Sequence, residues 1–319
     1  MTAPKSPFAR HIARLLAHKR ALGIAYHREQ GFLAEFERAT RNWPDDVVSD
    51  PVVRMYLSKH TDGGRQHRLT VIRALAKFLV LERPETFVPP PRFLGIRRRR
   101  VPIRVLSREE ASRFLLACDA LPDITAFPRG LVYGTALRAL LLTGLRRGEL
   151  IALQDQDVDL VERVVNVRCG KFGKSRLVPI SPDLADRFRT CRLMLTARIA
   201  KRQPADAFFP RADGHRTMSP KTLYKIFRDV LELAQIPHLG RGRGPRLHDC
   251  RHSFAVLKLL SWYEAGADLR VKLPLLATYL GHVGLASTQD YLHMTEDLIG
   301  EVMKRQRAVF GDLITEVGP

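Results

Sequence analysis

A stretch rich in proline and arginine between residues 88 and 102 constrains the fold of this 319-residue chain more than any other feature. Three consecutive prolines, Pro89 to Pro91, hold a chain extended. The four arginines from Arg97 to Arg100 carry too much charge to pack in an apolar core. The stretch therefore predicts a linker, either solvated or lying along phosphates, between two folding units at residues 1–87 and 103–319.

The first unit has the apolar spacing of a small helical domain. Apolar side chains recur every three or four positions from Phe8 to Leu16 and again from Leu69 to Leu79. The opposite face of the second of these segments carries basic side chains: Arg65, His67, Arg68, Arg73 and Lys77. Such a face is either an ordinary solvated surface or a surface that faces DNA.

The second unit is expected to be mainly helical with a small β-sheet. Ser107-Arg-Glu-Glu110 is a capping box that starts a helix. Apolar and β-branched runs at 164–167 and 176–180 flank the turn Lys171-Phe-Gly-Lys174, which predicts a hairpin with lysines at its tip. Further helices are predicted near 183–200, 219–235, 249–264, 272–281 and 295–311.

The charge of the chain limits its partners. There are 53 Lys and Arg against 33 Asp and Glu, a formal charge of +20, which predicts a polyanion such as DNA or RNA as the partner. The four cysteines are far apart and form no CxxC, so we expect neither a zinc site nor a disulfide framework. The N-terminus lacks a long apolar region and no run reaches membrane-spanning length, so a cytoplasmic protein is expected.

Several short segments of the second unit carry reactive side chains, and each alone has an ordinary structural explanation. Arg146 ends the segment TGLR, where a cation favours the C-terminus of a helix. His248 and Arg251 have the i, i+3 spacing of one helical face, and His282 follows a glycine. Tyr291 differs from the other six tyrosines in lying in a polar run after an apparent helix break.

Taken in order, these segments resemble the tyrosine recombinase (phage integrase) family. TGLRRGEL, GKFGKSRLVP, HDCRHSFA, LGH and TQDY occur in the family's order and spacing, and the likeness covers nearly the whole chain. It implies a helical core-binding domain at 1–87 and a mixed α/β catalytic domain at 103–319. The catalytic residues that it implies are Arg146, Lys171, His248, Arg251, His282 and Tyr291.

Some positions depart from the family pattern or leave a choice. Cys250 stands where an aliphatic residue is usual, and Phe172 stands where glycine is frequent. Lys171 and Lys174 both lie in the hairpin turn, and the family alignment favours Lys171. The segment from Trp262 to Leu273 is longer than usual, which affects contacts with partners and leaves the chemistry unchanged.

The resemblance implies a site-specific recombinase or integrase that cleaves and rejoins double-stranded DNA. Tyr291 would form a 3′-phosphotyrosyl bond, with no metal, ATP or other cofactor. Arg146 and Arg251 would clamp the nonbridging phosphate oxygens, with Glu149 orienting Arg146. His248 would act as a base or phosphate donor. The hairpin lysine would protonate the leaving 5′ oxygen, and His282 would donate a hydrogen bond to the phosphate.

The implied assembly is a tetramer on two specific DNA sites. Apolar residues recur at helical intervals between Leu298 and Ile314, and this tail either packs on its own domain or docks on a neighbouring protomer. The segment LPLLATYLGH is similar to transposon recombinases, which suggests a role in transposition or on another mobile element. The target sequence cannot be read from the chain, because it depends on which side chains enter which groove.

Three other functions fit parts of the pattern. A type IB topoisomerase shares the tyrosine chemistry, but the short two-domain layout and the GKFGKSRLVP hairpin favour a recombinase. A DNA-binding regulator without activity has no need of the six chemical residues. A metal phosphohydrolase built on His248 and Asp249 needs further His and Asp ligands, and no such set is present at metal spacing.

Overall fold

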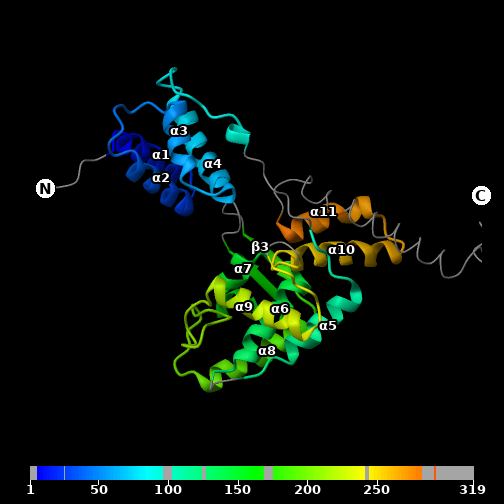
Figure 1. Cartoon of the computed structure of the whole chain (residues 1–319). Helices are drawn as coiled ribbons and strands as arrows, with labels where there is room; N and C mark the ends of the chain where they lie inside the picture. Colours follow the sequence, from blue (N-terminus) through cyan, green and yellow to red (C-terminus); the bar gives the residue numbers. More distant parts are fainter. Residues whose placement is uncertain are drawn as a thin grey trace, which may run out of the picture. The chain divides into compact units, whose positions relative to one another are not determined.

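The computed structural model describes residues 6–24, 26–95, 103–123, 127–168, 175–240, 244–281 and Tyr291. The chain divides into two compact units, Met1–Arg100 and Val101–Pro319 (Figure 1). The division falls within the stretch from which the linker is predicted. Among the described residues, no helix has the length and apolar character that a membrane span requires.

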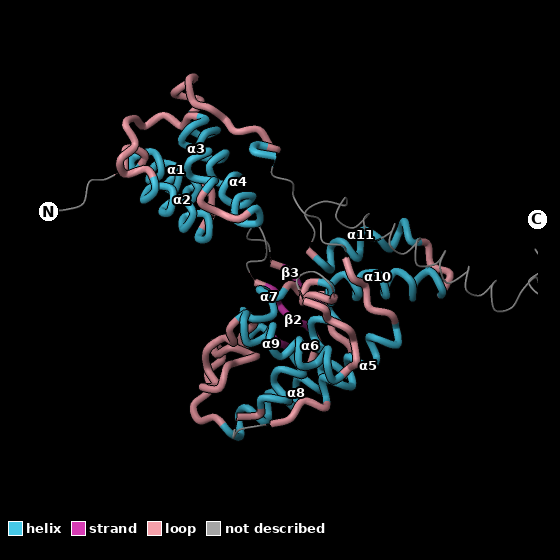
Figure 2. The backbone as a smooth tube through the Cα atoms, viewed as in Figure 1, coloured by secondary structure: helices cyan, strands magenta, loops and turns pink. Residues whose placement is uncertain are grey.

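The first unit packs its helices around one apolar core. These are α1 (Ala9–Ala21), α2 (His27–Ala39), α3 (Asp50–Ser58) and α4 (Asp62–Leu79) (Figure 2). Phe36 lies at the centre of the core, with its ring 5.0 Å from that of Phe8 and 5.2 Å from that of Tyr56. These three aromatic side chains are buried and tie α2 to α3 and to the start of α1.

The basic face of α4 is partly used inside this unit. The Nε of Arg65 donates to the carbonyl of Leu57 at 3.1 Å, and the Nε of Arg68 donates to Glu35 at 2.8 Å. A guanidinium that binds partners of its own domain offers fewer donors to a phosphate. The face is therefore a mixed surface, with part of its charge used in packing.

The proline-rich stretch begins inside the first unit. Phe93, in the short 3-10 helix η1 (Phe93–Gly95), is buried with its ring 5.5 Å from that of Phe87. Arg73 donates to the carbonyls of the first two prolines at 2.6 Å each. Residues 88–95 therefore pack on the helical unit instead of forming a free linker, because flanking aromatic side chains supply apolar surface. Residues 96–102, with the four arginines, lie outside the described residues.

The second unit is built on the buried helix α6. It contains α5 (Arg108–Asp119), α6 (Arg129–Thr143), α7 (Arg147–Ala152), α8 (Pro182–Arg198), α9 (Pro220–Leu233), α10 (Asp249–Glu264) and α11 (Leu269–Leu280). Helix α6 contacts α5, α8, α9 and α10. A Cβ at Gly134 would lie 2.1 Å from the carbonyl oxygen of Cys118, so α5 and α6 approach this closely only because the residue is glycine.

A small antiparallel sheet completes this unit. Its strands β1 (Val158–Asp159), β2 (Val164–Val167) and β3 (Arg176–Pro179) lie in the order β1-β2-β3, with Val165 opposite Val178. The predicted hairpin strands and the capping box at Ser107 are confirmed. The fold is mainly α with a small β-sheet, as predicted, while the hairpin turn and the predicted helix at 295–311 lie outside the described residues.

Helices α10 and α11 lie side by side and enclose a second apolar cluster (Figure 1). Leu259 of α10 and Leu276 and Leu280 of α11 belong to it. Tyr291 also belongs to this cluster and is only 3% exposed. The packing of these two helices thus places the tyrosine next to the first turn of α10.

Candidate active site

Two glycine-capped helix ends meet at Arg251, in the first turn of α10. Helix α6 ends at Gly144 (φ 62°) and α11 ends at Gly281 (φ 68°), left-handed conformations that glycine adopts without strain. Arg251 is 2% exposed, and its Nη1 and Nη2 donate to the carbonyls of Gly144 at 2.8 Å and of Leu280 at 2.7 Å. The guanidinium is therefore held by two backbone carbonyls, one at the end of each helix.

The environment of Arg251 lowers its pKa. Burial is the main cause and the charge of Arg146 adds to it, while Tyr291 has a smaller opposite effect, and the result is a pKa of about 10. The side chain remains cationic at neutral pH. Arg251 lies near a second cation and has little access to water. An anion such as a phosphate would therefore stabilise the two charges.

Arg146 lies just after the glycine cap of α6, at the N-cap of α7. Its Nη2 donates to the carbonyl of Gly281 at 3.0 Å, and its Nη1 donates to Glu149 at 2.7 Å. The two predicted phosphate-binding arginines thus bind consecutive carbonyls of one turn, those of Leu280 and Gly281. The predicted contact between Glu149 and Arg146 is confirmed.

Glu149 also binds a third arginine, Arg176, at the start of β3. Burial opposes ionisation of the Glu149 carboxyl, but hydrogen bonds from Arg176 and Arg146 outweigh it and lower the pKa to about 2. The Nε of Arg176 donates to the carbonyl of Tyr279 at 2.8 Å. Arg176 therefore connects the base of the hairpin to the last turn of α11.

The two histidines of α10 lie one helical turn apart. The ring of His248, at the N-cap, is 4.7 Å from that of His252 in an edge-on arrangement. Burial and the charge of Arg251 lower the pKa of His248. Burial, together with His248, lowers the pKa of His252 to about 4. At neutral pH His252 is thus a neutral imidazole.

Tyr291 contacts His252 directly. Its hydroxyl lies 3.0 Å from Nδ1 of His252, and the two rings are 5.4 Å apart. The sequence places Tyr291 in a polar run, but the side chain is buried in the cluster between α10 and α11. Its hydroxyl lies at the polar edge of that cluster, beside the first turn of α10.

Four of the six predicted catalytic residues are described, and the structure brings them together, with His248 placed beside His252 and Arg251: Arg146, His248, Arg251 and Tyr291. Lys171, its alternative Lys174, and His282 lie outside the described residues. Sequence reasoning missed His252 and Arg176. Both lie inside segments that carry the family likeness, HDCRHSFA and GKFGKSRLVP, and the i, i+4 spacing of the two histidines is the signal that was available for the first.

Asp249, which follows His248, is bound by an arginine of the preceding loop. Asp249 is fully buried and its carboxylate accepts hydrogen bonds from the backbone and side chain of Arg246 at 2.8–3.0 Å. Within the described ranges, no group of three or more His, Cys, Asp or Glu side chains is arranged to hold a metal ion. The carboxylate has a structural role at the start of α10.

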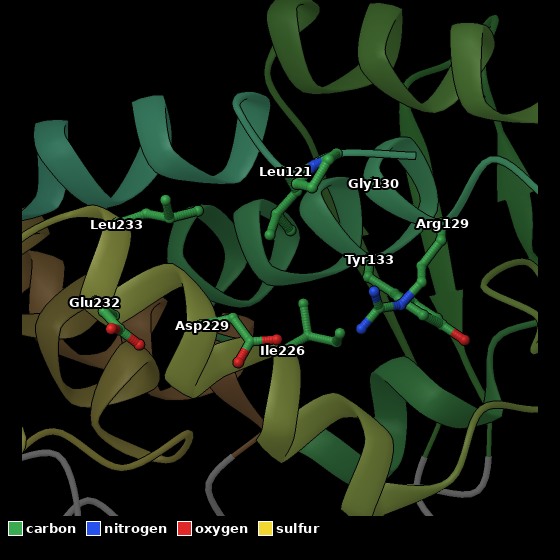
Figure 3. A pocket seen from close by; sticks show the side chains of 9 residues that line it. Leu121, Arg129, Gly130, Tyr133, Ile226, Asp229, Glu232 and Leu233 are labelled. Carbon is green, nitrogen blue, oxygen red and sulfur yellow. The ribbon is translucent and has the colours of Figure 1, made fainter. Parts of the chain in front are cut away.

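A pocket of about 370 Å³ lies elsewhere in the second unit. Figure 3 shows that Asp229 and Glu232 of α9 line one side, with Arg129 and Tyr133 of α6 on another. The pocket contains none of the residues around Tyr291, so it is separate from the candidate active site.

Comparisons with known proteins identify a family to which the chain is similar. Residues 104–297 match the Phage integrase family. The putative integrase/recombinase y4rE of Sinorhizobium fredii is 31% identical over 310 residues, covering 96% of this chain and 97% of the relative. Tyrosine recombinase XerD of Ralstonia nicotianae is 30% identical over 279 residues, covering 86% and 83%. The solved structure of the XerH site-specific recombinase, a post-cleavage complex with its palindromic difH substrate, has the same fold (TM-score 0.62, 17% identity, 86% of this chain and 78% of that one).

Proposed function

The chain belongs to the phage integrase family, and on that premise we propose that it is a site-specific tyrosine recombinase that uses Tyr291 as its nucleophile. The observation that carries this proposal is the placement of the Tyr291 hydroxyl beside the first turn of α10, which holds Arg251. Arg251 and Arg146 bind the same turn of the chain, so one phosphate could reach both guanidiniums.

The proposed reaction transfers a phosphodiester from DNA to the protein. The Oη of Tyr291 gives up its proton to a base, the role proposed for His248, and bonds to phosphorus as the bond from phosphorus to the 5′ oxygen breaks. This leaves a 3′-phosphotyrosyl link and a free 5′ hydroxyl. The bond energy is conserved in the intermediate, so rejoining needs no ATP. Attack by the 5′ hydroxyl of a second strand reverses the chemistry and completes the exchange.

Arg146 and Arg251 stabilise the extra negative charge that the nonbridging oxygens acquire in the transition state. Donors fixed in advance and shielded from water typically contribute about 3 kcal/mol each. His248 is proposed to act as the base that takes the Tyr291 proton or as a donor to the same phosphate. For the parts outside the described residues, Lys171 is proposed to protonate the departing 5′ oxygen, and His282 to donate to the phosphate.

The substrate is proposed to be double-stranded DNA with a specific site, and the net charge of +20 supports a polyanionic partner. DNA as substrate also supports the cytoplasm as the location. We propose a tetramer on two sites, with the tail at 298–314 docked on a neighbour. Truncation after residue 296 should then leave binding of one site intact and abolish pairing of two sites in a gel-shift assay; unchanged pairing would exclude docking between protomers.

The test of the proposed function is a covalent adduct. Wild-type protein and Tyr291→Phe would be expressed in cells, and protein linked to DNA would be isolated under denaturing conditions and sequenced. Wild type should give adducts at a defined sequence, and Tyr291→Phe should bind that sequence and give none. Adducts that persist in the variant would disprove the assignment.

The same preparation separates a recombinase from a type IB topoisomerase. A recombinase forms adducts at one site and joins strands from two duplexes that carry it. Relaxation of supercoiled plasmids that lack the site would instead support the topoisomerase. The likeness to relatives named as recombinases, over 97% and 83% of their length, favours the first outcome.

A further inference from the structure

His252 makes a direct contact with the reacting atom of the proposed nucleophile. Its Nδ1 lies 3.0 Å from the Tyr291 hydroxyl, a normal hydrogen-bond length. The two residues are 39 positions apart in the chain, so the contact depends on the packing of the segments that carry them. The ring planes are inclined at 57°, which lets the hydroxyl approach the edge of the imidazole where its nitrogens lie.

The protonation state and the tautomer of His252 together determine the direction of this hydrogen bond. Burial and the nearby His248, with further contributions from Arg246 and Arg251, keep the pKa of His252 near 4, whereas Asp249 acts in the opposite direction. The imidazole is therefore neutral at pH 7 and has one nitrogen that accepts and one that donates. The Tyr291 hydroxyl is a donor to Nδ1 when the proton of His252 is on Nε2, and this is the tautomer that the role proposed below requires.

The apolar side chains around the Tyr291 ring explain why its hydrogen bond with His252 matters. Ala255, Val256 and Leu259 of α10 and Leu276 and Leu280 of α11 belong to the cluster around Tyr291, and their side chains are apolar. Such neighbours hold the ring by contact but cannot fix the direction of its hydroxyl hydrogen. A polar partner at the edge of the cluster can do so.

We propose that His252 is a further catalytic residue, which accepts the hydrogen bond of the Tyr291 hydroxyl and fixes the direction of the nucleophile beside Arg251. This role rests on the proposed function. It is distinct from phosphate binding, which is proposed for Arg146 and Arg251. With its proton directed to His252 before the reaction, the hydroxyl oxygen presents a lone pair to the phosphorus, and the proton leaves to the proposed base His248 as the new bond forms. Misplacement of a reacting group by as little as 1 Å can slow a reaction about a hundredfold.

Three substitutions at His252 test whether the residue acts as a hydrogen-bond acceptor or only packs against Tyr291. His252→Asn places an amide oxygen close to the position of Nδ1, while His252→Leu has the same branching and nearly the same volume without an acceptor. His252→Gln is polar but extends one bond further, toward the position of Nε2. All three would be made in the full chain.

The measurement is the first-order rate of adduct formation at saturating protein. The substrate is a synthetic duplex that carries the mapped site, nicked so that the released fragment diffuses away. Binding of the same duplex is measured by gel shift, and folding by the melting temperature. His252→Leu and His252→Gln should be slower than wild type by about tenfold or more with unchanged affinity, and His252→Asn should stay within a few-fold of wild type.

Equal rates for the Asn and Leu variants, whether fast or slow, would overturn the assignment. If His252→Leu fails to fold, the comparison of Asn with Gln decides, because both are polar and only the position of the acceptor differs. If the proposed function itself is wrong, the result is different: wild type forms no adduct that depends on Tyr291. The two ideas therefore fail separately.

Discussion

Glu149 and Arg176 form a bidentate ion pair that joins the start of α7 to the start of β3. The two bonds measure 3.0 Å and 2.9 Å, and the same carboxylate binds Arg146 at 2.7 Å. A single buried carboxylate therefore holds one proposed phosphate-binding arginine and the base of the hairpin whose turn carries Lys171. Loss of this carboxylate should affect both elements at once.

Glu149→Gln should destabilise the protein and slow adduct formation. Removal of one partner from a buried ion pair typically costs about 3–5 kcal/mol, because the other charge is left without compensation. The side chains of Glu149 and Arg176 are only 7% and 13% exposed, so little solvent is available to replace the lost partner. Urea unfolding at pH 7 measures the free energy of unfolding.

The matched control for this change is Glu264→Gln. Glu264 pairs with Arg108 at the surface, where both side chains are about half exposed, and such pairs contribute at most about 1 kcal/mol. Equal destabilisation by the two substitutions would mean that the buried carboxylate has no special role.

The contribution of Glu149 should also disappear in acid. Its pKa is about 2 in the folded protein, below the ordinary value of 4.5, so the ionised form stabilises the fold. That contribution is complete above about pH 4.5 and is lost as the pH falls toward 2. The difference in unfolding free energy between wild type and Glu149→Gln, measured by urea at a series of pH values, should shrink across this window. A constant difference would mean that the carboxyl has its ordinary pKa.

The sequence predicts the fold better than it predicts the connections within the site. The start of α5 and the strands of the hairpin follow from local patterns, a capping box at Ser107 and β-branched runs. Four of the proposed catalytic residues were found because short motifs keep their order along the chain. Such signals are local, so they can be read from neighbouring residues.

The contacts that were missed are those between distant segments. The pairing of His252 with Tyr291 spans 39 residues and that of Arg176 with Tyr279 spans 103. Neither contact can be inferred from the periodicity of the sequence, because each depends on how α11 packs. The stretch at 88–95 shows the same limit: three prolines predict an extended linker, while the packing of Phe93 depends on a surface formed by other segments.

Gly144→Ala should reduce both stability and cleavage. Gly144 has a φ of +62°, and an added Cβ would lie 2.7 Å from a ring carbon of Phe254 and 2.9 Å from a methyl of Leu280. The carbonyl of Gly144 accepts a hydrogen bond from Arg251, so a shift of this turn displaces that guanidinium. We expect a loss of about 2–3 kcal/mol from strain and overpacking together, measured by urea unfolding, and a slower rate of adduct formation.

Gly266→Ala is the control for backbone strain alone. Gly266 has a similar φ of +71°, and nothing lies within 4 Å of the added Cβ. This variant should lose about 1 kcal/mol and keep the wild-type cleavage rate. A normal cleavage rate in Gly144→Ala would show that the turn does not position Arg251.

Arg251→Lys should nearly abolish cleavage while the protein still binds its site. A lysine keeps the charge but lacks the planar fork that donates to Gly144 and Leu280 and would also reach a phosphate. Loss of one positioned donor of this kind costs about 3 kcal/mol of barrier, a rate roughly a hundredfold lower. Single-turnover adduct formation gives the rate and a gel shift gives the affinity. A rate within a few-fold of wild type would mean that charge alone suffices.

Lys171, rather than Lys174, should protonate the departing 5′ oxygen. Both lysines lie in the sequence between β2 and β3, and β3 is tied through Arg176 to Glu149, which also binds Arg146. Replacement of the 5′-bridging oxygen by sulfur gives a leaving group that needs no proton. On this substrate Lys171→Ala should recover the wild-type rate of adduct formation, whereas on ordinary DNA it should be slow. Lys174→Ala should cleave both substrates at similar rates. Rescue of Lys174→Ala alone would transfer the role to that residue, and a Lys171→Ala variant that remains slow with sulfur would show that this lysine does not act as the acid.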